Sequence, residues 1–301
     1  MFKGSVISYP NRGQWGNSKY RGNCSGHVIK DFVETYHGAN DSLFADPSVG
    51  GGTSRDVAES MGLRFKGLDL HNGYNLLTDS LATALGEQAK TIFWHPPYHD
   101  MIHYSDSADN GMWGNEPHPG DLSRQASLSD FIEGCSVAFQ NIYDALENGG
   151  HYGILIGNQR KKGKYYNLSS MLERFCPGEL RDEIIKIQHN CVSDRRQYSS
   201  QIVRIEHEKL LVFKKIRQLY AFSYANWLEN KIKKSHRITW RAAIRAAFIK
   251  KPVISLSELY QELAPFAKTK DNKHPEARIR AIVQDERYFT RVDRGTYSLA
   301  A

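Results

Sequence analysis

The hydrophobic pattern of residues 1–215 alternates between short apolar runs and segments with helical spacing. Val28, Ile29, Phe32 and Val33, for instance, fall on one face of a helix predicted near residues 24–36. Strands are predicted at 42–45, 65–70, 91–94, 152–156, 184–188 and 210–213, and further helices at 53–61, 76–88 and 128–146. This alternation predicts an α/β fold, a doubly wound parallel sheet with helices on both faces.

Three connections in this part of the chain have distinctive compositions. The polar stretch 100–129 is long for a plain connection and is typical of a functional or mobile loop. Gly149 and Gly150 are predicted to stop the helix that begins near residue 128. Residues 157–166, GNQRKKGKYY, are predicted to form a basic loop at the carboxyl end of a buried strand.

Residues 216–301 follow a different pattern. Helices are predicted at 219–233, 239–249, 257–263 and 275–284, with a short extended piece at 253–256 and a hairpin over 288–299. Pro275 suits a first helical position. Three helices followed by a hairpin predict a winged helix-turn-helix, so two domains are expected, 1–215 and 216–301. A helical interaction domain that binds no nucleic acid is the alternative.

Charge is divided unevenly between these two parts. Residues 216–301 hold 17 Lys+Arg and 8 Asp+Glu, a net charge of +9, so the whole-chain value of +7 leaves −2 for residues 1–215. A nearly neutral body with a basic tail is typical of an enzyme joined to a module that binds a polyanion. Solubilising surface charge is the alternative, although basic residues also cluster locally, at Lys231, Lys233, Lys234, Arg237, Arg241, Arg245, Lys250 and Lys251.

Composition excludes several classes of protein. A hydrophobic share of 40% with 24% charged residues excludes disordered and fibrous chains. No run approaches the roughly 18 apolar residues of a membrane span, and no secretory signal is visible, so a cytoplasmic protein without membrane contact is expected. The four cysteines are scattered and the histidines form no metal-binding motif, so neither disulfides nor a metal site are expected.

Candidate binding residues follow the predicted strands. Asp46, Asp69 and His95 each come at or just after the end of a strand, where α/β sheets bind ligands. The glycines at 50–52 permit a tight turn into the next helix, whose N-terminus suits an anionic or nucleoside ligand. Asp69, 23 residues after Asp46, could accept hydrogen bonds from ribose hydroxyls. Together they indicate an adenosine-containing cofactor; a simple glycine turn with a solvated Asp is the alternative.

The run His95-Pro96-Pro97-Tyr98 suits recognition of an exocyclic amino group. Two prolines stiffen the backbone and leave carbonyl groups that can accept hydrogen bonds. The preceding side chain can accept a second amino hydrogen, and the Tyr98 ring can stack on a planar base. A purely structural Pro-Pro turn is the alternative.

Two motifs carry a family resemblance. Asp46-Pro47-Ser48-Val49-Gly50-Gly51-Gly52-Thr53 resembles the D-P-F-x-G-x-G-T cofactor motif, and His95-Pro96-Pro97-Tyr98 resembles the D/N/S-P-P-Y catalytic motif, of the S-adenosylmethionine-dependent DNA amino-methyltransferases. The helix after Arg21-Gly22-Asn23 is similar to their N-terminal motif, and residues 207–214 resemble their closing strand. The likeness covers about residues 17–215, in the motif order of the subgroup that recognises its target after the catalytic part.

The resemblance implies a Rossmann-like methyltransferase fold and a set of site residues. For S-adenosylmethionine it implies Asn23, Asp46, Pro47, Gly50, Gly52, Thr53, Asp69 and Asp79. For catalysis on the target base it implies His95, Pro96, Pro97 and Tyr98. Methyl transfer to an amine needs no covalent intermediate, so no cysteine is required. The tail is similar to winged-helix domains, including those appended to restriction-modification proteins.

His95 departs from the family pattern, which has Asp, Asn or Ser at this position. A neutral imidazole has one acceptor nitrogen and an imidazolium has none. We therefore expect activity to decline as the pH falls through the titration of His95. The alternative is that His95 only packs against the strand and the Pro carbonyl suffices.

Basic side chains supply the candidates for DNA contact. Those of the predicted loop are Arg160, Lys161, Lys162 and Lys164, and those of the tail are Arg278, Arg280, Arg291 and Arg294. A solvated basic loop is the alternative for the first set.

The expected function is a site-specific DNA methyltransferase acting on an exocyclic amino group, with adenine N6 preferred. Double-stranded DNA is the expected partner and a cognate restriction endonuclease a further candidate; the oligomeric state is open. The alternatives are cytosine N4 in DNA, guanine N2 in RNA, a catalytically idle DNA-binding protein, and a protein glutamine amide.

Overall fold

The computed structural model describes residues 1–38, 41–105, 116–190, 201–216, 239–269 and 272–300. Its main sheet contains β1 (Val6–Ser8), β2 (Leu43–Asp46), β3 (Arg64–Gly67), β4 (Ala89–Trp94), β5 (Leu146–Gly157), β8 (Glu179–Ile187) and β9 (His207–Lys214). The strands lie in the order β3-β2-β4-β5-β9-β8-β1. All neighbours are parallel except β9, which is antiparallel to β5 and β8. The α/β class is confirmed, with a mixed sheet.

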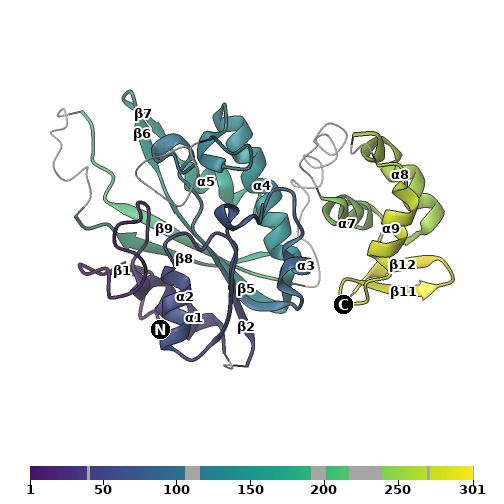
Figure 1. Ribbon diagram of the computed structural model, residues 1–301, viewed down its shortest axis with the longest axis horizontal. Helices are drawn as coiled ribbons and strands as arrows, with labels where there is room; N and C mark the ends of the chain where they lie inside the picture. Colours follow the sequence, from purple (N-terminus) through teal and green to yellow (C-terminus); the bar gives the residue numbers. More distant parts are fainter. Residues whose placement is uncertain (39–40, 106–115, 191–200, 217–238, 270–271, 301) are drawn as a thin grey trace.

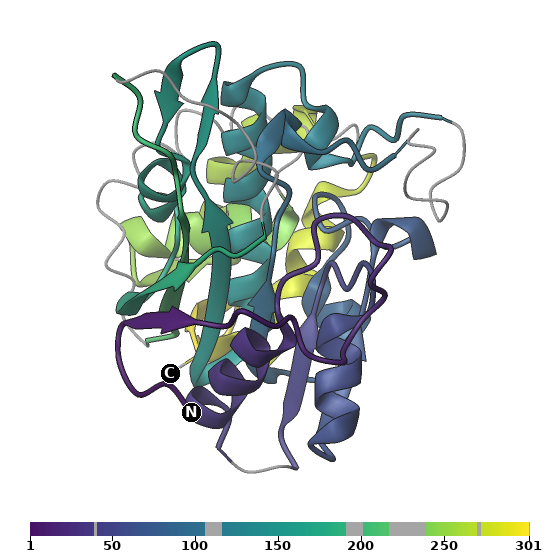
Figure 2. The ribbon, with the colours of Figure 1, turned by 90° about the vertical axis from the view of Figure 1, so that its left-hand side faces the viewer.

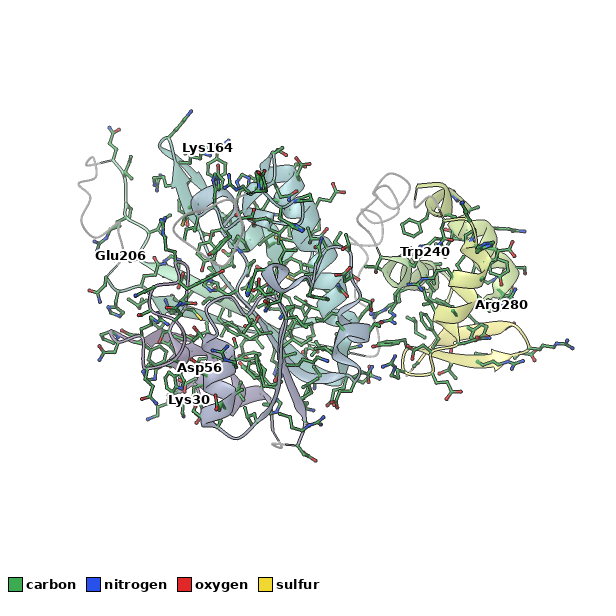
Figure 3. All side chains as sticks on the ribbon, in the orientation of Figure 1. Lys30, Asp56, Lys164, Glu206, Trp240 and Arg280 are labelled. Carbon is green, nitrogen blue, oxygen red and sulfur yellow. The ribbon has the colours of Figure 1, made fainter. Side chains whose placement is uncertain are left out.

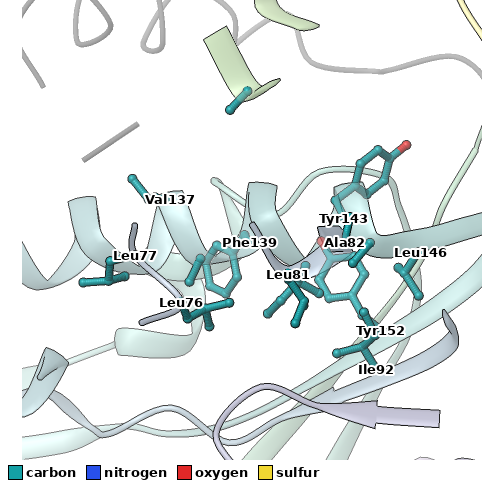
Figure 4. Close-up of a cluster of buried hydrophobic side chains, with 14 of the residues drawn as sticks. Leu76, Leu77, Leu81, Ala82, Ile92, Val137, Phe139, Tyr143, Leu146 and Tyr152 are labelled. Carbon is teal, nitrogen blue, oxygen red and sulfur yellow. The ribbon is translucent and has the colours of Figure 1, made fainter. Parts of the chain in front are cut away.

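Helices cover both faces of this sheet (Figures 1 and 2). They are α1 (Gly26–Tyr36), α2 (Thr53–Ser60), α3 (Leu81–Leu85), α4 (Leu128–Ala145) and α5 (Leu168–Glu173). Because alternate strand residues point to opposite faces, Phe93 packs with α1 and α2, whereas Ile92 and Trp94 pack with α3 and α4. Figure 4 shows the second cluster, in which Leu81 and Phe139 meet strand residues. Two apolar layers thus hold the sheet in place.

The helix predicted at 76–88 is shorter than expected, because polar side chains bind the backbone ahead of it. Asp79 accepts the amide of Asn75 at 2.8 Å, and Asn75 accepts that of Leu77 at 3.0 Å. Such side-chain bonds offer the backbone an alternative to the helix. The helix α3 therefore begins only after the N-cap Ser80 and ends at Gly86, which has a φ of 81°.

Gly149 does not stop the preceding helix as predicted. The helix α4 ends at Ala145, and Leu146 already has extended geometry and starts β5. Gly149, with a φ of 79°, lies inside β5 and donates its amide to the Lys215 carbonyl at 3.0 Å. The glycine pair accommodates an irregular stretch of strand rather than a helix end.

Residues 157–166 are more regular than the predicted basic loop. They include a two-stranded hairpin, β6 (Gln159–Lys161) and β7 (Lys164–Tyr166), whose turn residues Lys162 and Gly163 both have positive φ. The edge strand β1 and the short helix α5 were not predicted, because each has too few residues to show a clear period.

The C-terminal unit, residues 239–300, has its own three-stranded antiparallel sheet. Its elements are α7 (Trp240–Lys250), β10 (Val253–Ser255), α8 (Leu256–Thr269), α9 (Pro275–Val283), β11 (Phe289–Asp293) and β12 (Thr296–Leu299). The strands lie in the order β10-β12-β11. The predicted hairpin is confirmed, but α8 extends past Pro265, six residues beyond the predicted end. The helix predicted at 219–233 lies outside the described residues.

A cationic and aromatic contact joins the C-terminal unit to the rest of the chain. Arg245 of α7 forms an ion pair with Asp144 of α4, and its guanidinium lies 4.9 Å from the Tyr143 ring centre. The Lys215 ammonium lies 5.2 Å from the Tyr143 ring centre and 5.8 Å from that of Tyr288. One apolar cluster runs through both parts. Among the described helices, none is long and apolar enough to cross a membrane.

Candidate active site

A cavity opens at the carboxyl edge of the parallel strands. The sequence-predicted residues that line it are Asn23, Asp46, Pro47, Gly50, Thr53, Asp69, His95 and Pro97. The remaining predicted residues, Gly52, Asp79, Pro96 and Tyr98, do not line it. Residues from three strand ends and from the segment before α1 therefore meet in one space.

The glycine turn between β2 and α2 brings its backbone close to the segment before α1. Gly50 and Gly52 have φ values of 45° and 84°, which a side-chain-bearing residue rarely adopts. A Cβ atom on Gly51 would lie 2.6 Å from Nδ2 of the Asn23 side chain. The Gly51 carbonyl also accepts the Asn17 amide at 2.8 Å. Small residues are thus required for this close approach.

Two buried carboxyl groups lie beside the turn. Asp46 accepts hydrogen bonds from the Ser48 amide at 2.9 Å and from the Ser54 hydroxyl, and burial raises its pKa to about 7. Asp69 accepts the Gly50 amide at 2.7 Å and the Nδ1 of His71 at 2.7 Å. That hydrogen bond raises the pKa of His71 against the effect of burial. Asp69 therefore fixes the turn while lining the cavity.

Thr53 lines the cavity, and its hydroxyl oxygen lies against Gly16. It is the first residue of α2, and its Oγ1 is buried without a hydrogen-bond partner among the described residues. A buried hydroxyl without a partner is costly. The free amides of a helix N-terminus also lie here. The combination suits an anionic ligand group such as a carboxylate.

Asp79 has a structural role in the turn before α3, where it accepts the amide of Asn75 and the hydroxyl of Thr78. Asn75 lines the cavity in its place, and sequence patterns gave no signal for it. Two further lining residues, Tyr20 and Tyr104, were also missed; their rings stack with centres 5.9 Å apart. Their separation along the chain hides this pairing from any local pattern.

His95 and Tyr98 belong to a partly buried hydrogen-bonded row. His95 Nε2 lies 2.9 Å from the Tyr98 hydroxyl, which donates to Glu208 Oε1 at 2.7 Å. Glu208 Oε2 accepts from the Lys186 ammonium at 2.6 Å. Burial lowers the pKa of His95 to about 4 and raises that of Tyr98 well above its usual value. His95 is therefore neutral near pH 7.

Glu208 stays ionised in this row. Burial alone would raise its pKa, but the Lys186 ammonium, His95 and the Tyr98 hydroxyl together outweigh burial and hold the pKa below its usual range. Glu208 lies in the strand that resembles the closing strand of the family. No role for Glu208 was visible in the sequence, because its partners come from other parts of the chain.

The predicted DNA-contact residues fall into two well-separated groups (Figure 3). In the β6–β7 hairpin, Lys161 pairs with Asp100 and Arg160 lies over the Tyr165 ring, while Lys162 and Lys164 are exposed. In the C-terminal unit, all four predicted arginines are exposed, on α9 and on the β11–β12 hairpin. They are Arg278, Arg280, Arg291 and Arg294.

Three of the four cysteines lie in the described part of the chain. Cys24, Cys135 and Cys176 are free thiols, and Cys191 lies outside the described residues. Within the described ranges, no group of three or more His, Cys, Asp or Glu could hold a metal ion.

Comparison with known proteins finds no matching family model and no matching curated protein. Among solved structures, TrmN from Thermus thermophilus is 13% identical with a TM-score of 0.37, over 65% of this chain and 50% of that chain. A protein from the same organism, proposed to be a DNA modification methylase and complexed with S-adenosyl-L-methionine, is 15% identical with a TM-score of 0.29 over 52% and 61%. Human N-acetylserotonin methyltransferase is 10% identical with a TM-score of 0.32 over 64% and 51%.

This chain thus spans about half the length of TrmN. The identities and TM-scores are too low to assign any neighbour's activity to this chain.

Proposed function

We propose that this chain is an S-adenosylmethionine-dependent DNA methyltransferase that acts on an exocyclic amino group, with adenine N6 preferred. One observation carries the proposal. The glycine turn, the two buried carboxyl groups, His95 and Pro97 meet at one cavity, although they are distant in sequence. A methyl donor and an amino acceptor have to share such a space for direct transfer.

The cavity wall fits the chemical groups of S-adenosylmethionine. Thr53 Oγ1 and the start of α2 suit its carboxylate. Asp69 accepts three protein donors, and a carboxylate has about four acceptor sites, which leaves room for a ribose hydroxyl. Asn23 and Gly50 line the same wall. When bound, the cofactor would supply an electrophilic methyl group.

His95 and the proline backbone would hold the target amine. A neutral imidazole accepts one amino hydrogen through its unprotonated nitrogen, and a Pro carbonyl accepts the other. When both amino hydrogens are donated in these bonds, the lone pair of the amino nitrogen points away from the two acceptors. The same bonds exclude water from the nitrogen. The base itself would have to leave the helical stack to reach this depth.

The C-terminal unit is proposed to bind double-stranded DNA as a winged helix. Its order, helix, strand, helix, helix, strand, strand, is compatible with that fold, and α9 presents Arg278 and Arg280 to solvent. The net charge of +9 over residues 216–301 supports a polyanionic partner. On this proposal the chain divides into a methyltransferase domain, 1–215, and a DNA-binding domain, 216–301, and a restriction endonuclease is a candidate partner.

Calorimetry with the full chain separates this function from its main rivals. S-adenosylmethionine should bind in the micromolar range or tighter, and duplex DNA should bind more tightly than RNA of the same length. Failure to bind the cofactor would favour an idle DNA-binding protein. Cofactor binding with a preference for RNA would favour the guanine N2 alternative.

A further inference from the structure

We infer that Glu208 and Lys186 are positioning residues that hold His95 in the Nε2–H tautomer and so make Nδ1 the hydrogen-bond acceptor that meets the target amino group. The tautomer follows from the described contacts alone. The role toward a target amine rests on the proposed function.

The sheet builds the row that reaches His95. Lys186 and Glu208 are direct cross-strand partners on β8 and β9, and Glu208 is the partner of Gly157 on β5. A Cβ atom on Gly157 would lie 2.6 Å from the Tyr98 ring. The bare backbone of Gly157 therefore lets Tyr98, which follows β4, cross β5 and reach Glu208.

Proton positions in the row follow one after another from Lys186. The Lys186 ammonium has only hydrogen-bond donors, so the Glu208 oxygen beside it must be the acceptor. The Glu208 carboxylate has only acceptors, so the single proton of the Tyr98 hydroxyl is donated to it. The Tyr98 oxygen is then left as an acceptor toward His95.

His95 can meet that oxygen only by donating from Nε2. A neutral imidazole that carries its proton on Nε2 has its lone pair on Nδ1. His95 lines the cavity, and in the described part of the chain its ring has no hydrogen bond other than the one to Tyr98. Nδ1 is thus the nitrogen left for a ligand, and an N–H group of the ligand is what it accepts.

Substitution of Glu208 by Gln tests this chain of donors. Lys186 still requires an acceptor, so the Gln oxygen faces Lys186 and its amide N–H₂ faces Tyr98. The Tyr98 hydroxyl must then donate to His95 Nε2, which moves the imidazole proton to Nδ1. In the Glu208→Gln variant His95 would present a donor where the wild type presents an acceptor.

The experiment measures ¹⁵N shifts of the His95 ring in the full chain without DNA. The inference expects Nε2–H in the wild type, Nδ1–H in Glu208→Gln, and a mixture in Tyr98→Phe, which removes the relay but keeps the ring. Glu183→Gln is the matched control, since Glu183 pairs with Lys209 at 3.0 Å on the same two strands but on the opposite face. That control should leave the His95 tautomer as in the wild type.

Turnover links the tautomer to catalysis. Glu208→Gln should lower kcat by about 10²-fold or more while the cofactor Kd stays unchanged. Nδ1–H in the wild type, or the same tautomer in Glu208→Gln, overturns the inference. An unchanged kcat in a Glu208→Gln variant whose tautomer has switched overturns the role toward the amine. A wild type with the expected tautomer but no methyl transfer to any nucleic acid defeats the proposed function and leaves the tautomer assignment standing.

Discussion

Arg245 of α7 and Asp144 of α4 form an ion pair whose side chains are only 10% and 3% exposed. The pair joins the C-terminal unit to the helix that covers the sheet. Removing one partner of a buried pair leaves an uncompensated charge. We predict that Arg245→Met lowers the free energy of unfolding by about 3–5 kcal/mol, measured by urea denaturation of the full chain.

The double variant Arg245→Met/Asp144→Leu is the control for this pair. Because it leaves no buried charge, its stability should return close to that of the wild type. A single variant within about 0.5 kcal/mol of the wild type would show that the two parts of the chain do not share this contact in solution.

Thr53→Val should separate cofactor binding from folding. The substitution keeps the shape of the side chain and removes the hydroxyl oxygen, which has no hydrogen-bond partner in the described part of the chain. We predict unchanged or slightly higher thermal stability, together with about tenfold weaker binding of S-adenosylmethionine by calorimetry, because one hydrogen bond to a charged group is lost. An unaltered affinity would remove Thr53 from the cofactor site.

The pH dependence of the site is set by burial of His95. The acceptor role of a neutral imidazole predicts a decline of activity at the titration of His95, and burial moves that pKa to about 4. His95 should therefore cause no loss of turnover between about pH 6 and 8, on either side of the ordinary His value of roughly 6.5. A loss near pH 6.5 that disappears in His95→Asn would contradict this assignment.

Stability gives a second measurement on the same residue. Between pH 6.5 and 4 the unfolded chain binds a proton at His95 that the folded chain does not, so the stability of the folded state falls as the pH falls. The contribution of His95 is a slope of about 1.4 kcal/mol per pH unit in that range. His95→Asn should reduce the slope of the unfolding free energy against pH by this amount. An equal slope in both proteins would show that burial does not lower the pKa of His95.

Sequence patterns predicted the sheet strands other than β1, and the glycine turn, because each depends on local periodicity. Asp46, Asp69 and His95 were placed at strand ends and do line one cavity. The Tyr98–Glu208 bond could not be predicted, since it joins residues 110 positions apart through the register of three strands. Nor could sequence patterns predict that Asn75 lines the cavity and Asp79 does not, because this depends on a turn that side-chain hydrogen bonds close.

DNA binding should depend mainly on the exposed arginines of the C-terminal unit. Replacing Arg278, Arg280, Arg291 and Arg294 together by Gln in the full chain should weaken duplex binding at all sequences. The slope of log K against log salt should fall by about one for each arginine that meets a phosphate.

Two comparisons complete that experiment. Lys162→Gln/Lys164→Gln tests the exposed part of the β6–β7 hairpin. Lys30→Gln/Arg64→Gln, on α1 and β3, is a control that removes the same two charges as this lysine pair and should change neither affinity nor slope. If the four-arginine variant binds like this control, the basic tail serves only solubility.

Methyl transfer itself is tested most directly with the full chain, methyl-labelled S-adenosylmethionine and mixed-sequence duplex DNA, followed by digestion to nucleosides and mass analysis. Tyr98→Ala, which breaks the row to His95, is the control. The proposal predicts labelled N6-methyladenine with the wild type and its loss in the variant. Cofactor binding without any labelled nucleoside from DNA would contradict it.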